Sequence, residues 1–383
     1  MAHLRRFLRR RSPGRSHWAV MSGVAFFLCG QLALALALSW WPLRIDPEYD
    51  LRLESLRACM AEHPAQRPVL FLGSSRVTCT LRPALLAVNH GDSDGPVVFN
   101  FGLCRSGPVM ELLCLRRLLA DGVHPECIFL EVWPTLVGTD GPYQMTLIDP
   151  ERLRLSDTRL LRRFTPDARY GSWQWLARRF TYWRTYRKQL LYPGTPSLVL
   201  ANKQHDIEWE GLDHWGWLAI PGFKTYDDRP RPAWLQEFVK KGQTVFFDGF
   251  APSADSLRAY AELFALCRRE NIKVGLVAMP DGFLRDYSPD GQRLMDLFLR
   301  RFSQENNLAM VDARTWASPG DFVDGIHLTQ SGAAAFTKRF EREVLDPYLN
   351  GEPLVRRWPP GHTDGAAYSG ATPTGPLSST GGE

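Results

Sequence analysis

Three residues near opposite ends of the chain have the types and the order needed for nucleophilic catalysis. Ser75 closes the stretch PVLFLGSS, while Asp324 and His327 stand three residues apart in DGIH. A serine hydroxyl is a weak nucleophile until a base takes its proton. An aspartate that binds Nδ1–H of a histidine fixes its tautomer and leaves Nε2 free for that hydroxyl. The residues therefore predict a Ser-His-Asp triad, although a lone histidine before a helix is more often a cap or a polar residue with satisfied hydrogen bonds.

The segments that must position these residues alternate between short apolar runs and helical patterns. In the segment 256–269, apolar residues recur at helical spacing and predict one buried stripe, namely Leu257, Tyr260, Ala261 and Phe264. We predict strands at Val69–Leu72, Val97–Phe101, Cys127–Val132, Val274–Met279 and Leu308–Val311, and helices at Val109–Ala120, Ser256–Arg269, Gly291–Gln304 and Ala333–Leu345. This alternation predicts an α/β domain with a parallel five-stranded sheet covered on both faces. Ser75 then lies just past a carboxyl strand end, where ligands bind in such sheets.

A serine in a G-x-S turn after the first strand, followed by Asp-x-x-His before the last helix, resembles the SGNH or GDSL hydrolase superfamily. The resemblance covers residues 68–349 apart from an insertion. It implies a three-layer, flavodoxin-like fold in which Ser75 is the nucleophile, His327 the base and Asp324 its orienting partner. The literal string GDSD at 91–94 precedes a strand and has the composition of a turn, so Ser93 is not our candidate.

The same resemblance implies an oxyanion hole built from three donors. These are the N–H of Ser75, a glycine N–H after the second strand and an asparagine after the third. Gly107 fits the second position and Gly102 fits it less well, but FLEVWPTL has no asparagine where Gly-x-Asn-Asp is expected. Loss of one donor costs about two to three orders of magnitude in rate. Arg76 and Arg105 are candidates for binding an anionic group of the substrate, with a surface role as the alternative for Arg76.

The N-terminus has the pattern of a membrane anchor. Residues 18–41 carry no charge and are long enough to cross a bilayer, and tryptophans stand at both ends. Residues 1–17 form a basic segment that predicts a cytoplasmic N-terminus and an exported C-terminal part. A cleaved signal peptide is the alternative, but the apolar run is long for one and Trp40-Trp41-Pro42 is a poor cleavage site.

Two further segments interrupt or follow the α/β pattern, which we assign to residues 42–350. In the insertion at about 138–242, arginines accumulate with aromatic residues that include Trp173, Trp175, Tyr182, Trp183 and Tyr186. This composition fits a membrane-surface face, an aromatic groove for a glycan, or solvated arginines over a local core. The tail, residues 351–383, is rich in Gly, Pro, Ser and Thr and is expected to be disordered.

Charge and cysteine content restrict the remaining function classes. The net charge of the chain is +5, and six arginines lie before residue 17, which leaves 5 − 6 = −1 for the rest and gives no support for nucleic-acid binding. The seven cysteines show no metal-ligand spacing, and most read as core residues, although export would permit disulfides. We expect no cofactor and no metal.

The anchor and the Gly-Ser-Ser block together resemble membrane-anchored SGNH-like proteins of cell-envelope polymer acylation. That resemblance implies a serine esterase or O-acyltransferase acting on an envelope or extracellular polysaccharide, with a membrane acyltransferase as a possible partner. It also implies a single-pass inner-membrane protein whose domain is periplasmic. The alternative is a catalytically inactive SGNH-like scaffold that binds a polysaccharide or an acyltransferase partner.

Overall fold

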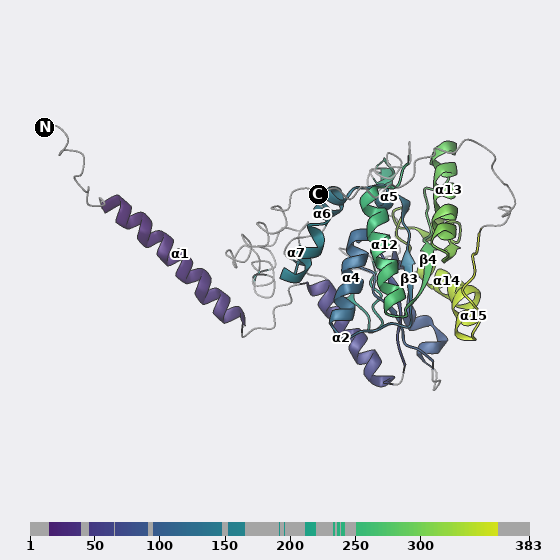
Figure 1. Cartoon of the computed structure of the whole chain (residues 1–383), viewed down its shortest axis with the longest axis horizontal. Helices are drawn as coiled ribbons and strands as arrows, with labels where there is room; N and C mark the ends of the chain where they lie inside the picture. Colours follow the sequence, from purple (N-terminus) through teal and green to yellow (C-terminus); the bar gives the residue numbers. More distant parts are fainter. Residues whose placement is uncertain are drawn as a thin grey trace, which may run out of the picture.

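A five-stranded, all-parallel sheet forms the centre of the domain (Figure 1). The strands are β1 Val69–Leu72, β2 Val98–Asn100, β3 Cys127–Glu131, β4 Lys273–Ala278 and β5 Ala309–Asp312, in the order β2-β1-β3-β4-β5. The computed structural model describes residues 15–39, 46–64, 66–90, 95–147, 152–164, 191, 195, 211–219, 233, 236–237, 239–241 and 250–358. Both ends of each strand lie within one residue of the predicted positions. The predicted α/β class and parallel five-stranded sheet are confirmed.

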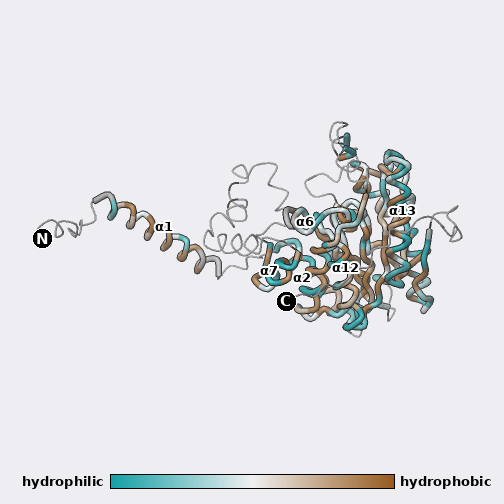
Figure 2. Tube along the Cα trace, turned by 45° about the horizontal axis from the view of Figure 1, so that its top comes forward, coloured by the Kyte–Doolittle hydropathy of each residue, from teal (hydrophilic) through white to brown (hydrophobic). Residues whose placement is uncertain are grey.

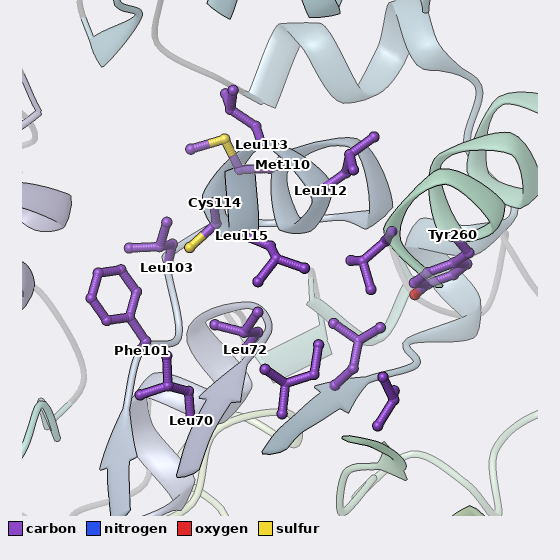
Figure 3. Packing of buried hydrophobic residues seen from close by; sticks show 14 of the residues in the cluster. Leu70, Leu72, Phe101, Leu103, Met110, Leu112, Leu113, Cys114, Leu115 and Tyr260 are labelled. Carbon is purple, nitrogen blue, oxygen red and sulfur yellow. The ribbon is translucent and has the colours of Figure 1, made fainter. Parts of the chain in front are cut away.

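Alternate residues of the strands pack on opposite faces of the sheet. In β1, Leu70 and Leu72 belong to one buried apolar cluster, whereas Val69 and Phe71 belong to the other. Figure 3 shows Leu70 and Leu72 beneath residues of the helix that follows β2. Because both sets are buried, β1 reads in sequence as a continuous apolar run rather than an alternating one.

Helices contribute to both apolar clusters. Those packed with Leu70 and Leu72 are α2 Pro47–Glu62, α4 Pro108–Ala120, α12 Ala254–Arg269 and α13 Pro289–Glu305. Those packed with Val69 and Phe71 are α14 Gln330–Phe340, continued by a π turn at Glu341–Leu345, and α15 Asp346–Leu349. Shorter helices are α3 Ser75–Thr80, α5 Pro134–Val137, α6 Gly141–Leu147 and α7 Leu155–Leu161, with 3-10 turns at Pro83–Leu85, Ala87–Asn89 and Pro319–Asp321.

The buried stripe of α12 differs from the predicted one. Tyr260 and Phe264 are buried as expected, but Leu257 is 38% exposed and Ala261 is also exposed. The buried positions are Ser256, Ala259, Tyr260, Leu263, Phe264, Leu266 and Cys267. The sequence pattern of 257, 260, 261 and 264 was therefore shifted toward the solvent edge of the true stripe, since a helix with several apolar residues permits more than one apolar arc.

Helix α2, which the sequence analysis did not predict, is fixed to the domain by a buried ion-pair network. Asp46, its N-cap, accepts hydrogen bonds from Arg117 Nη1 of α4 and from Arg152 Nε, each at 2.8 Å. Arg117 also binds Asp157 of α7 at 2.5 Å. Burial alone would raise the pKa of Asp46, but Arg152 and Arg117 outweigh it and hold that pKa below its ordinary value. Asp46 is thus bonded directly to α4 and is connected through Arg117 to α7.

The N-terminal helix α1, Arg15–Ser39, extends away from the domain (Figure 1). Its large apolar side chains face outward; Phe26, for example, is 83% exposed. Figure 2 shows apolar residues along most of its length. In the described part of the chain, α1 is the one helix long and apolar enough to cross a membrane, a criterion that a signal sequence also meets.

The first residues of the segment predicted to be disordered are part of the folded domain. Residues 351–358 pack on the domain, where Arg357 N donates to Met310 O at 2.8 Å and Asp312 N donates to Arg357 O at 2.9 Å. The reason is that β5 is an edge strand whose free backbone groups can pair with a passing segment. Residues 359–383 lie outside the described residues, as do the aromatic residues named above at 173, 175, 182, 183 and 186 and the GDSD string at 91–94.

Candidate active site

Ser75 is the first residue of α3, directly after the turn that ends β1. Ser74 is the N-cap of α3, and its hydroxyl accepts a hydrogen bond from Arg76 N at 3.1 Å. Gly73 is required at this turn because a Cβ there would stand 2.5 Å from Val77 Cγ2 and 2.6 Å from Glu131 Cβ. The tight strand-to-helix turn leaves Ser75 partly exposed, whereas the flanking Ser74 and Arg76 are buried.

The structure brings Ser75, His327 and Asp324 together in one hydrogen-bonded chain. Ser75 Oγ lies 2.8 Å from His327 Nε2, and His327 Nδ1 lies 2.9 Å from Asp324 Oδ2. His327 is 9% exposed and Asp324 is 1% exposed. With Nδ1–H donated to the carboxylate, Nε2 is the basic nitrogen and faces the hydroxyl, which is the arrangement that activates a serine.

The loop between β5 and α14 holds the histidine in this orientation. Asp324 Oδ1 accepts from the backbone N–H groups of Ile326 and His327 at 3.1 and 2.9 Å. Val323 N donates to His327 O at 2.9 Å. Gly325, between them, has a φ of +88°, and an added Cβ would collide with the ring of Phe283. The aspartate therefore fixes both its loop and the imidazole, and a glycine is needed to close the turn.

Two backbone N–H groups beside this chain are candidates for binding an oxyanion. Ser75 N–H is at the first turn of α3, and Gly107 N–H is at the N-cap of α4 after β2. Among the described residues, neither group has a hydrogen-bond partner. Gly102, the weaker candidate, donates its N–H to Asn100 Oδ1 at 3.0 Å and is thereby occupied. Of the two glycines, Gly107 is therefore the better candidate for the second oxyanion donor.

Glu131, at the end of β3, has a role that the sequence analysis missed. Its Oε2 accepts a hydrogen bond from Ser74 N at 2.7 Å, and its Oε1 lies 3.7 Å from Arg76 Nε. The residue is 1% exposed. A hydrogen bond from a backbone N–H to a buried carboxylate is charge-assisted and strong. Glu131 therefore clamps the residue before Ser75 and couples the third strand to the nucleophile turn.

Arg76 is the candidate whose assigned role must be corrected. It is 2% exposed, its Nη2 donates to Met279 O and Pro280 O at 2.9 and 2.7 Å, and its guanidinium lies 4.9 Å from the centroid of Trp133. Neither an anion-binding side chain nor a surface residue would be enclosed in this way. Arg76 instead joins α3 to the segment after β4. Two backbone carbonyl oxygens and the Trp133 ring offer electron-rich partners to its planar guanidinium.

The other arginine candidate, Arg105, lies on the surface near Gly107. It is exposed and has a φ of 63°, a backbone conformation that is uncommon outside glycine. The preceding residue connects this loop to α2, because Cys104 N donates a hydrogen bond to Glu48 Oε1 at 2.8 Å. A role for Arg105 in binding substrate remains a prediction.

A second carboxyl group, Glu111 of α4, is buried near Glu131. Burial raises the pKa of Glu111 well above its ordinary value, and the negative charge of Glu131 adds to the shift, while a hydrogen bond with Tyr260 opposes it. Tyr260 OH also donates to the backbone oxygen of Glu131 at 3.2 Å. Burial therefore favours the protonated form of Glu111, and that form relieves the repulsion between two carboxyl groups behind the nucleophile turn.

Replacement of Glu111 by glutamine should stabilise the protein as pH rises. The pKa of Glu111 is higher in the folded than in the unfolded chain, so its contribution is complete below the ordinary value of 4.5 and is lost as pH rises toward the folded pKa. Each pKa unit by which the folded value exceeds the unfolded value costs about 1.4 kcal/mol of folding free energy once the pH is above both. The thermal midpoints of Glu111→Gln and wild type should coincide near about pH 4 and separate in favour of the variant by about pH 8. A constant difference across this range would contradict the assignment.

Asn100 and Trp133 also contact the site without having been predicted. Asn100 Nδ2 donates to Val77 O at 2.8 Å and to Leu81 O at 2.7 Å, which caps the C-terminal end of α3 from β2. Trp133 precedes α5, and its buried indole N–H has no hydrogen-bond partner among the described residues. Thr135 is buried in α5. For Asn100, the one available signal in the sequence was that asparagine often occurs at helix ends.

Neighbouring acidic residues have partners of their own. Asp281 accepts from Tyr287 OH at 2.9 Å, and Asp312 forms an ion pair with Arg314 at 2.6 Å. Asp324 is thus the carboxylate that the structure pairs with His327. Within the described residues, no group of three or more His, Cys, Asp or Glu side chains is arranged to hold a metal ion.

Comparison with protein-family models and with curated protein sequences finds no match to this chain. Functional assignment therefore depends on the geometry described above.

Proposed function

We propose that the protein is a membrane-anchored serine esterase or O-acyltransferase of SGNH type that acts on a cell-envelope or extracellular polysaccharide. The observation that carries the proposal is the chain of hydrogen bonds from Ser75 through His327 to Asp324. The strand order, with β1 between β2 and β3, is the flavodoxin-like order and supports an SGNH-type fold. A single-pass anchor in the inner membrane, with the domain outside the cytoplasm, is part of the same proposal.

The reaction begins when Ser75 Oγ attacks the carbonyl carbon of an acyl ester. The hydroxyl proton moves to His327 Nε2, and Asp324 stabilises the resulting imidazolium. The oxyanion binds to the N–H groups of Ser75 and Gly107. His327 then returns the proton to the departing alcohol, which leaves the acyl group on Ser75. An incoming sugar hydroxyl gives its proton to His327, attacks the acyl-serine and regenerates the free serine.

Transfer to a sugar should compete well with hydrolysis in such a site. With no asparagine after β3, one oxyanion donor worth about 3 to 4 kcal/mol is missing. A bound acceptor can offset that loss, because well-oriented reactants reach effective molarities of about 10⁵ M or more, and water gains nothing from such positioning. Stacking of sugar rings on the aromatic residues of the insertion stays a prediction, since those residues lie outside the described part of the chain.

The test uses the purified full chain with a small aryl acetate. We expect slow release of the aryl alcohol, faster release when an envelope oligosaccharide is added, and an acetylated oligosaccharide detectable by mass spectrometry. Fast hydrolysis without an acylated sugar would identify a simple esterase. The absence of both turnover and labelling by a fluorophosphonate would favour an inactive scaffold, the alternative that the missing asparagine supports.

A further inference from the structure

A groove between α4 and α7 has an unusual concentration of arginine. It encloses about 860 Å³, and its lining contains six arginines and one acidic residue, Asp157. That aspartate is buried and already paired with Arg117. The lining contains none of Ser75, His327 or Asp324. The groove is therefore a feature separate from the candidate active site, and its open face is cationic.

The arginines of the groove fall into two groups. Arg117 and Arg154 already form ion pairs with carboxylates. Arg117 pairs with Asp46 and Asp157, and Arg154 pairs with Asp121. The other four are exposed, and we call them the arginine face: Arg116, Arg159, Arg162 and Arg163. Within the arginine face, Arg163 forms an exposed ion pair with Glu262 at 2.7 Å. Arg116 and Arg159 have no ion-pair partner among the described residues.

An exposed apolar side chain accompanies these charges. Leu155 begins α7, lines the same groove and is 62% exposed. Leu160, also in the lining, is buried and anchors α7 to the domain. A cluster of arginines beside an exposed leucine matches the composition of surfaces that lie in the interface of an acidic bilayer, where guanidinium groups bind phosphate oxygens and the apolar side chain enters the headgroup boundary.

The connection to α1 brings this face close to the membrane. Six residues, 40–45, separate the end of α1 from Asp46. Even fully extended, the chain from Ser39 to Asp46 covers only about 25 Å. Asp46 is hydrogen-bonded to Arg117, which itself lines the groove. Figure 1 shows α7 and the start of α2 on the side of the domain nearest to α1, with α13 on the opposite side.

We propose that the arginine face, together with Leu155, docks on the acidic phospholipid headgroups of the membrane in which α1 is anchored. The contact fixes the orientation of the domain and leaves the edge that carries Ser75 open to a polymer. The inference depends on the proposed anchoring by α1 and is independent of the acyl chemistry, because fluorophosphonate labelling of Ser75 reports that chemistry separately.

The test places a fluorophore on the arginine face of the full chain reconstituted in vesicles. Ser156→Cys, an exposed position in the groove, carries the label in a background in which Cys29 and Cys104 are changed to serine. A lipid-borne quencher should quench this label at least about threefold more strongly in vesicles of equal parts phosphatidylcholine and phosphatidylglycerol than in phosphatidylcholine alone. High salt should abolish the difference, since screening weakens exposed charge pairs.

Two controls make the result specific. Arg116→Glu with Arg159→Glu should remove the added quenching, whereas Arg293→Glu with Arg301→Glu, on the exposed side of α13, should not. A label at Gln304→Cys, also on α13, should respond equally little in both kinds of vesicle. Equal quenching at positions 156 and 304, or quenching at 156 that is insensitive to phosphatidylglycerol, would overturn the proposal. Failure of the chain to float with either kind of vesicle would overturn both the anchor and the docking, while Ser75 labelling would still report on the chemistry.

Discussion

Ser75→Ala should reduce hydrolysis of an aryl acetate to the background rate, a loss of about three orders of magnitude or more. No other group can replace the hydroxyl, because His327 Nε2 faces Ser75 Oγ at 2.8 Å and takes its proton. The fold should be retained, since that hydroxyl bonds to His327 and the N-cap of α3 is supplied by Ser74. The measurement is the initial rate of aryl alcohol release by the full chain, with a thermal melt to verify folding.

The matched control is Ser93→Ala, which changes the serine of the literal GDSD string and should leave the rate unchanged. Retention of the wild-type rate in Ser75→Ala, or a comparable loss in Ser93→Ala, would remove the basis for the proposed nucleophile.

The second large effect is expected for Asp324→Asn, which should lower kcat by about 10⁴-fold with little change in KM. The asparagine oxygen can still accept from the N–H groups of Ile326 and His327, so the loop should persist. The amide nitrogen facing Nδ1 cannot accept its proton, however, and the imidazole is driven toward the tautomer in which Nε2 is protonated. Nε2 then no longer serves as a base.

Asp321→Asn serves as the control in the same loop, because its carboxylate accepts from Ser318 N at 2.7 Å and is not bonded to His327. Steady-state kinetics of the two variants should differ by orders of magnitude. If Asp324→Asn keeps a near-wild-type kcat, the aspartate has only a structural function in the loop.

The elements next to the site were predictable because their signals are local. The apolar run at 69–72 ends at a glycine that the packing requires, and Asp324 and His327 are only three residues apart in one loop. Such short-range patterns are independent of the rest of the fold. The expectation that Ser75 and His327 meet, although 252 residues separate them, came from the parallel-sheet pattern and from the family resemblance.

The features that were missed depend on contacts between distant segments. Glu131 looked like a departure from a motif, but in the structure it clamps Ser74 N, a partner 57 residues away. Arg76 was expected to reach substrate or solvent, yet the segment after β4 encloses it. Helix α2 has little apolar periodicity because its buried positions include charged residues, such as Glu48, which pairs with Arg152. No single-sequence pattern encodes such pairings.

The central claim is that Ser75 is an activated nucleophile, and the most direct test is the site of modification by a fluorophosphonate. The full chain, folded and in detergent, is treated with the probe, digested and analysed by tandem mass spectrometry. The proposed chemistry predicts a single phosphonylated serine, Ser75, in the peptide that follows β1, and loss of the adduct in His327→Ala, because the hydroxyl then lacks its base. An adduct on another serine, or an unmodified Ser75 in a protein that still turns over ester, would contradict it.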